Sequence, residues 1–233
     1  MAVSLFIARR YLFSKKSTNA INVISAISVV GVAVATMALV IVLSVFNGFH
    51  DLVASLFTAF DPQIEVVPAK GKDAPTDDPL LTEIKQLPEV DVATECVEDN
   101  ALVFYGDKQA MVTIKGVDDN FTQLTRINDL LYGEGEFALR AANLQYGVLG
   151  IRLAQQLGTG ARWKGFMRVF APNREGQFDI SNPASGFVVD SLLSPGVVFS
   201  VRQAKYDQRY ILTSVSFARN LFGMQGMLTA LEL

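Results

Sequence analysis

Residue types that commonly carry enzyme chemistry are scarce in this chain. It contains one histidine, His50, and one cysteine, Cys96. A catalytic triad or a multi-histidine metal site needs histidine beside other reactive groups, and His50 directly follows a long apolar run. Cys96 has no second cysteine with which to form an intramolecular disulfide. We therefore expect no catalytic residue and no metal site in this chain.

Two short motifs resemble ligand sites but lack essential positions. Gly71-Lys72 lacks the upstream glycine and the hydroxyl residue of a phosphate-binding loop. Asp118-Asp119-Asn120 lacks the spaced ligands and the closing glutamate of a calcium loop. We interpret it as a turn in which Asp118 or Asp119 caps a following helix. We expect no cofactor to bind this chain.

A long apolar segment near the N-terminus must position everything that follows it. No charged residue occurs between Ser17 and Phe49. At ~1.5 Å per residue, the core from Val23 to Phe46 reaches about 36 Å, which is enough to cross the hydrocarbon layer. The apolar part of a signal peptide is shorter, at about 7 to 15 residues. We predict a transmembrane helix over residues 17–49.

The charges that flank this segment predict its orientation. The basic residues before it are Arg9, Arg10, Lys15 and Lys16. Basic flanks stay in the cytoplasm, so we expect a cytoplasmic N-terminus, with residues 1–16 as an amphipathic helix along the inner headgroups or as simple stop-transfer flanking. Residues 50–233 should then form a domain outside the cytoplasm. This domain is net acidic, which argues against nucleic acid as a partner.

Small residues within the predicted span indicate contact with another helix. Gly31 and Ala35 lie four residues apart on one helical face, where small side chains let a second helix approach closely. A lone anchor that happens to be rich in alanine is the alternative. We favour a partner helix, because a lone anchor gains nothing from small residues at this spacing.

The residues after the span predict an α+β fold, a mixed α/β domain of short strands with segregated helices. Apolar residues at helical spacing continue to Phe60 as an amphipathic stalk, which Asp61-Pro62 ends. A helix capped by Asp78 follows, and a later helix is closed by Gly158. Two more helices are expected over residues 120–131 and 214–222. Strands are expected over residues 63–67, 90–98, 101–105, 109–117, 161–171, 186–193, 197–201 and 228–233, with a hairpin at 106–108.

Several sequence segments resemble one family of membrane proteins. FIARRYLFSKK, followed by NVISAISVVGVAVATMALVIVLSVFNGFHDLV, resembles the start of the LolC/LolE lipoprotein-releasing ABC permeases. VTIKGVDDNF and GVLGIRLAQQLG are similar to segments of the MacB-like periplasmic core domain that these permeases share. The resemblance covers essentially the whole chain. Family members continue through three more transmembrane helices, so this sequence, which stops at Leu233, resembles the N-terminal half of a permease.

The resemblance implies a transport role in the bacterial inner membrane. A permease subunit of this kind would pair with a second permease subunit, identical or related. It would extract lipoprotein cargo from the membrane and pass it to a periplasmic lipoprotein carrier. A separate cytoplasmic ABC ATPase would bind the ATP and Mg that power this step. The alternatives within the family are an FtsX-like regulatory permease that activates cell-wall hydrolases and a MacB-like exporter of peptides or drugs.

Two sets of residues acquire expected roles from this resemblance. The outer half of the span would face the acyl chains of the cargo, or else only membrane lipid, through Val40, Leu43, Phe46 and Phe49. In LolC-type members a projecting periplasmic hairpin recruits the soluble carrier. By position, the loop from Pro172 to Pro183 corresponds to that hairpin, with Arg174 and Phe178 as the expected contacts. A solvated loop between two strands is the alternative for this segment.

Overall fold

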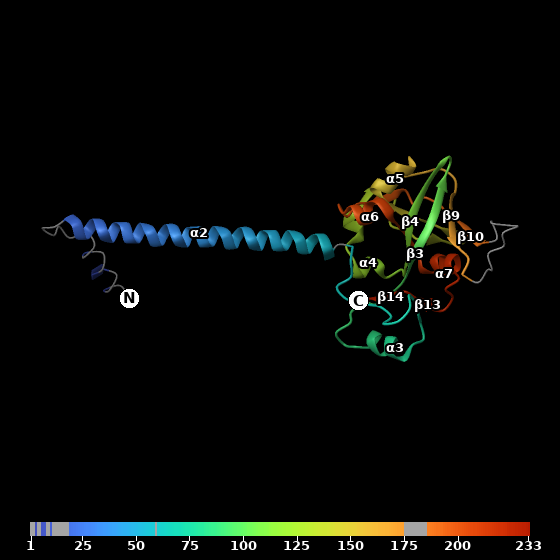
Figure 1. Ribbon diagram of the computed structural model, residues 1–233, viewed down its shortest axis with the longest axis horizontal. Coiled ribbons are helices and arrows are strands. Elements are labelled where there is room, and N and C mark those ends of the chain that lie inside the picture. The colour runs from blue at the N-terminus through green and yellow to red at the C-terminus, as the bar shows by residue number, and fades with distance from the viewer. Residues whose placement is uncertain (1–2, 4–5, 8–9, 11–18, 59, 175–185) are drawn as a thin grey trace. The chain divides into compact units, whose positions relative to one another are not determined.

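The computed structural model describes residues 3, 6–7, 10, 19–58, 60–174 and 186–233 (Figure 1). These residues form two compact units, which divide between Ala54 and Ser55. Helix α2 (Asn19–Thr58) makes up most of the first unit, and its last turn belongs to the second. The second unit contains all the strands of the described chain.

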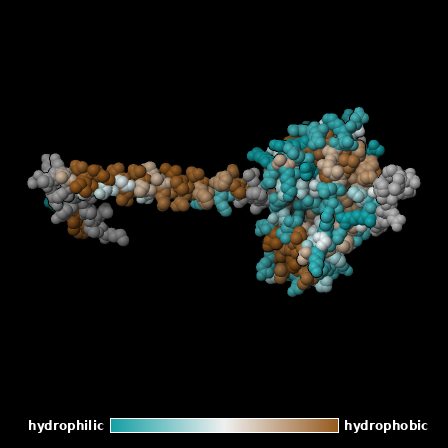
Figure 2. Space-filling view, in the orientation of Figure 1, coloured by the Kyte–Doolittle hydropathy of each residue, from teal (hydrophilic) through white to brown (hydrophobic). Residues whose placement is uncertain are grey.

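Helix α2 carries the predicted transmembrane segment. Among the described residues, one stretch is long and apolar enough to cross a membrane, Val23–His50, with a mean hydropathy of 2.8. Figure 2 shows hydrophobic side chains along this helix. The helix continues without interruption past Phe49 to Thr58, as expected for a stalk. No helix continues through Asp61-Pro62, which confirms the predicted end of the stalk.

A mixed sheet forms the centre of the second unit. Its strands follow the order β1 (Glu65–Val66), β14 (Ala230–Glu232), β3 (Thr94–Tyr105), β4 (Lys108–Val117), β12 (Tyr210–Ser214), β8 (Val148–Gly150), β11 (Val197–Phe199) and β5 (Leu131–Gly133). β12 runs parallel to β4, and β11 runs parallel to β8, whereas the other pairs in this order are antiparallel. This architecture confirms the predicted α+β class.

Four further strand pairings complete the fold. β9 (Met167–Pro172) lies beside the second half of β3, and β10 (Phe187–Leu192) pairs with β9. The long strands β3 and β4 run through the domain with β9 and β10 next to them (Figure 1). The two small sheets are β2 (Ala74–Pro75) with β13 (Met227–Leu228), and β6 (Arg140–Ala141) with β7 (Leu144–Gln145).

Short helices cover the sheet, and their ends follow local sequence signals. They are α3 (Pro79–Lys85), α4 (Phe121–Leu124), the 3-10 helix η1 (Ile127–Leu130), α5 (Ile151–Leu157), α6 (Ala204–Arg209) and α7 (Val215–Phe222). The Asp78 carboxylate accepts a hydrogen bond from the Leu80 amide at the start of α3, which confirms the predicted cap. α5 ends at Gly158, whose φ of 70° is the left-handed conformation that glycine adopts at helix ends.

The largest core cluster lies where α7 packs against the sheet. Phe217, Ala218 and Leu221 of α7 are buried in it together with Ile114 of β4. At Gly116 the helix and the strand approach so closely that an added Cβ would lie 2.4 Å from the Ala218 Cβ. A glycine at this position is therefore what lets α7 sit directly on β4.

The prediction of two separate strands over residues 90–98 and 101–105 is wrong. β3 runs unbroken from Thr94 to Tyr105 and pairs with β4 from Val97 onwards. The polar residues at its centre, typical of a turn, stay in the ladder because Asn100 faces Thr113 and accepts a hydrogen bond from its hydroxyl at 3.2 Å. The hairpin that joins β3 to β4 is confirmed.

The single helix predicted over residues 120–131 is divided into α4 and η1, and neither aspartate caps it. The Asp118 carboxylate instead accepts a hydrogen bond from the Glu95 amide at 3.1 Å. Asn120 stands at the cap position of α4 without a side-chain cap bond. Its amide group donates to the Ala93 carbonyl, and its side-chain oxygen accepts from Thr94. These side chains fasten the turn to the start of β3 rather than to the helix.

Residues 161–171 form a strand only in their second half. β9 begins at Met167, and Gly165, with a φ of 77°, precedes it in a loop. The sequence analysis also missed α6 and β12, although β12 lies between β4 and β8 in the sheet. The residues of β12 are all buried, so its sequence shows no polar alternation.

Candidate functional site

An exposed apolar surface crosses four strands of the domain. On β3 and β9 the inward side chains, such as Val103 and Val169, are fully buried, and the alternate residues face outward. The strand register places Met111, Leu102, Phe170 and Val189 directly beside one another on β4, β3, β9 and β10. We call these four residues the apolar row.

The apolar row is open to solvent at both ends. Met111 is 65% exposed and Val189 is 51% exposed, while Leu102 and Phe170 are partly buried between them. The Phe104 ring packs edge to face on Phe170, with centroids 5.0 Å apart. Contiguous apolar surface is typical of binding sites when it is extensive, so the apolar row is a candidate site. No local sequence pattern predicts the apolar row, because its two outermost residues, Met111 and Val189, come from strands far apart in the chain.

Cationic and further apolar groups border the row. The Arg168 guanidinium lies 5.8 Å from the centre of the Phe170 ring, a cation–π distance. Phe187, at the start of β10, is 44% exposed and stands opposite Pro172. A molecule that binds here would therefore meet an apolar strip with a positive charge at its margin.

Of the residues expected to bind the carrier, two are described. Pro172 is the exposed last residue of β9. The Arg174 guanidinium forms ion pairs with Asp73 at 2.8 Å and with Asp99 at 2.5 Å. These pairs fasten the chain just after β9 to β3 and to the loop before β2. Phe178 and Pro183 lie outside the described residues.

The hydrogen bond to Asp99, with that to Asp73, outweighs the effect of burial and raises the pKa of Arg174 further above its ordinary value. Arg174 is therefore a permanently charged anchor at the base of the loop. Its side chain is 33% exposed, so part of the guanidinium is still open to a partner. Its role as a carrier contact stays a prediction.

The residues expected to face acyl chains or a second helix lie on α2. Val40, Leu43, Phe46 and Phe49 are each more than half exposed. An added Cβ at Gly31 would meet nothing within 4 Å, so this face of the helix has room for a close neighbour. Neither role is tested by these observations, and both stay predictions.

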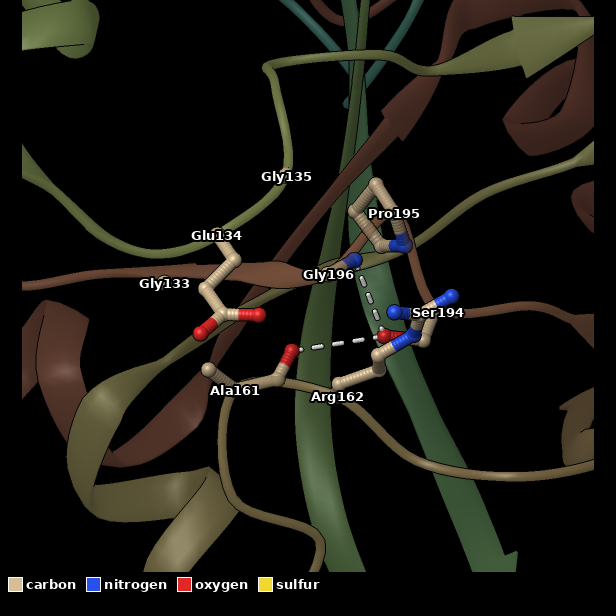
Figure 3. Close-up of a pocket in the computed structure, with 8 residues that line it drawn as sticks. All are labelled: Gly133, Glu134, Gly135, Ala161, Arg162, Ser194, Pro195 and Gly196. Carbon is tan, nitrogen blue, oxygen red and sulfur yellow. Dashed lines mark hydrogen bonds between the residues drawn. The ribbon is translucent and has the colours of Figure 1, made fainter.

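A separate cleft of about 400 Å³ opens between three loops (Figure 3). The Ser194 hydroxyl donates to the Ala161 carbonyl at 3.3 Å and accepts from the Gly196 amide at 3.1 Å. Because both of these hydrogen bonds are to backbone groups, the hydroxyl holds the loops together. In the described part of the chain, no cluster of three or more histidine, cysteine, aspartate or glutamate residues could hold a metal ion.

The comparison with protein families decides what kind of domain this is. A family model described as the MacB-like periplasmic core domain matches residues 25–170, which is more than half of the chain. The chain belongs to this family. The match extends from within α2 to β9, so it includes three of the four strands that carry the apolar row. The MacB-like domain is the extracytoplasmic part of ABC-transporter permeases, which work with a partner ATPase and as dimers.

One solved structure is also similar to this MacB-like chain. It is the extracellular domain of YknZ, a noncanonic ABC-type transporter from Gram-positive bacteria. The two chains share 12% sequence identity, and the TM-score is 0.45. The similarity covers 70% of this chain and 73% of the YknZ chain. Comparison with curated protein sequences found no match.

Proposed function

We propose that this chain is the permease subunit of an ABC transporter that extracts lipoproteins from the bacterial inner membrane and passes them to a periplasmic carrier. The observation that carries the proposal is the apolar row of this MacB-like domain, one of whose strands, β9, ends at Pro172. A second permease subunit and a cytoplasmic ATPase, which binds ATP and Mg, would complete the transporter.

The apolar row suits a carrier of acyl chains. A soluble protein that accepts a lipidated substrate needs an apolar mouth, and it gains free energy when that mouth covers another apolar surface. Docking would cover Met111 and Val189, the exposed ends of the row. Arg168 at its margin would attract an acidic group on the carrier.

The outer half of α2 would supply the membrane side of the same path. Acyl chains leaving the outer leaflet need apolar side chains along their way, and Val40, Leu43, Phe46 and Phe49 provide them. The N-terminus would be cytoplasmic and the MacB-like domain periplasmic, as the basic flank of the helix predicts.

Carrier capture tests the proposal. The full chain in detergent is immobilised, and purified periplasmic lipoprotein carrier is passed over it. We expect Val189→Asp to weaken capture by about tenfold or more, because docking would bury an unpaired carboxylate. Leu80→Asp is the matched control: Leu80 is 68% exposed on α3, away from the row in sequence and sheet, and its substitution should leave capture unchanged.

Equal capture by the wild-type chain and by Val189→Asp would remove the apolar row from the mechanism. Other captured partners would contradict lipoprotein release itself. A cell-wall hydrolase bound in place of the carrier would favour an FtsX-like regulatory permease. An outer-membrane channel would favour a MacB-like exporter.

A further inference from the structure

Phe60, the first described residue after α2, is completely buried. Its ring stacks on Phe199 with centroids 5.2 Å apart, and its centroid lies 4.6 Å from that of Tyr206. Phe121 and Tyr210 meet it edge to face. An aromatic side chain enclosed by four others is held by the area it buries and by ring geometry. Moving the Phe60 side chain out from among these four rings therefore costs free energy.

A buried ion pair lies next to the Phe60 ring. Lys115 Nζ is 2.6 Å from Glu232 Oε1, and the two side chains are only 5% and 2% exposed. The same ammonium lies 5.2 Å from the centroid of Phe60 and 5.6 Å from that of Phe121. Burial disfavours the charge on Lys115, but the paired Glu232 carboxylate outweighs this effect, so the pKa of Lys115 is raised. Lys115 is therefore charged at neutral pH, and Phe60 helps to exclude water from it.

The chain segment after Phe60 is also hydrogen-bonded to the end of the domain. Ile64 and Leu233 exchange two backbone hydrogen bonds, of 3.2 and 2.9 Å. β1 then pairs with β14. Tyr206 donates a hydrogen bond of 2.6 Å from its hydroxyl to the Asp61 carboxylate. Two segments from opposite ends of the domain sequence are thus fastened side by side.

We propose that Phe60, Lys115 and Glu232 form a latch that locks the segment following α2 (residues 60–66) to β14, so that the two segments open and close together. Phe60 covers the ion pair, and the ion pair ties β14 to β4. Removing either component exposes the other to water.

One oxygen of Glu232 favours opening of the latch. Glu232 Oε2 is buried and accepts no hydrogen bond from the described residues. A buried carboxylate oxygen without a partner costs free energy in the closed state. If Phe60 leaves, solvation of this oxygen would stabilise the open state. The inference does not depend on lipoprotein release, since it concerns only this chain.

Amide hydrogen exchange of the full chain in detergent tests the latch. The variants are Phe60→Leu, which removes the aromatic ring next to the ion pair, and Lys115→Met, which removes the buried cation. We expect each variant to speed exchange by about tenfold in both segments, residues 60–66 and 230–233. Phe187→Leu is the control, because Phe187 is exposed on β10, and it should change neither segment.

Cys96 provides an independent measurement at a residue that the chain already contains. It is the only cysteine, it is 1% exposed, and it stands opposite Ala230 of β14. Burial raises the pKa of its thiol well above the ordinary value, so it reacts only when the domain opens. Phe60→Leu and Lys115→Met should both accelerate its labelling by a thiol reagent.

Independent behaviour of the two segments would overturn the latch. In that case Phe60→Leu would speed exchange only over residues 60–66, and Lys115→Met would speed it only over residues 230–233. Unchanged labelling of Cys96 in both variants would also overturn the proposal. Amide exchange in β9 and β10 is the reference for general unfolding of the domain. If exchange in these strands also rises, the two variants have destabilised the whole domain, and a milder variant is used instead. This variant is Tyr206→Phe, which removes only the hydroxyl that binds Asp61. It must then give a smaller rise in both segments, and a rise in one alone rejects the proposal.

Discussion

Glu95 is bound by two cations that come from different parts of the chain. Lys85 Nζ, at the end of α3, lies 2.6 Å from Glu95 Oε1. Arg219 of α7 pairs with the other carboxylate oxygen and also donates to the Met227 carbonyl. Burial alone would raise the pKa of Glu95, but the hydrogen bonds from Lys85 and Arg219 outweigh it and lower the pKa.

This arrangement predicts a specific loss of stability in acid. A carboxyl group whose pKa is lowered by folding stabilises the protein above its unfolded pKa, and that stability is lost as the pH falls. We expect the wild-type melting temperature to fall below about pH 4.5. Glu95→Gln should flatten this fall and should cost about 1 kcal/mol at pH 7.

Circular dichroism melts of the full chain between pH 3 and 7 would measure the effect. Glu83→Gln is the control, since Glu83 is exposed on α3 and forms no ion pair among the described residues. The interpretation fails if Glu95→Gln and the wild-type chain lose stability in parallel as the pH falls.

At the level of elements, the contact between α7 and β4 depends on one missing side chain. A Cβ at Gly116 would lie 2.4 Å from the Ala218 Cβ and 3.1 Å from the Ser214 carbonyl oxygen. We expect Gly116→Ala to destabilise the domain by about 1–3 kcal/mol through overpacking. Gly48→Ala is the control, because a Cβ there would meet nothing and α2 would gain helix propensity.

Urea or thermal unfolding of the two variants measures this difference. If Gly116→Ala unfolds at the wild-type midpoint, α7 can shift without cost, and the close packing does not determine the position of the helix.

The elements also show which parts of the fold were predictable from sequence. α2, α3 and α7 were predicted well because their caps and apolar spacing are local. β12 was missed because a strand buried on both sides has no alternating pattern. The continuity of β3 was missed because β4 supplies the pairing that keeps its polar centre extended.

The candidate site was less predictable than the elements that form it. The role of Pro172 and Arg174 in carrier binding was predicted from their position in the chain and stays a prediction. The ion-pair partners of Arg174, Asp73 and Asp99, lie far from it in sequence, so no local pattern indicates them. The apolar row depends on the register of four strands, which no local pattern contains. The aromatic rings that surround Phe60 likewise come from segments distant in the sequence.

At the scale of the whole molecule, the permease must pair with a second permease subunit. If Gly31 and Ala35 form the helix contact, Gly31→Leu should reduce the cross-linked dimer severalfold in detergent or in membranes, because the helices can no longer approach. Ala33→Leu introduces the same leucine side chain about 200° around the helix and should leave the dimer intact. Equal loss in both variants, or in neither, would place the contact elsewhere.

The proposed function predicts a defect in lipoprotein transfer when this chain is depleted from the cell. If the chain serves lipoprotein release, triacylated lipoproteins should need the transporter that contains it in order to leave the inner membrane. The decisive measurement is the distribution of a pulse-labelled lipoprotein between inner and outer membranes after depletion of this chain. We predict that the lipoprotein accumulates in the inner membrane and that re-expressing the wild-type chain restores its transfer. Unchanged transfer to the outer membrane during depletion would contradict the account.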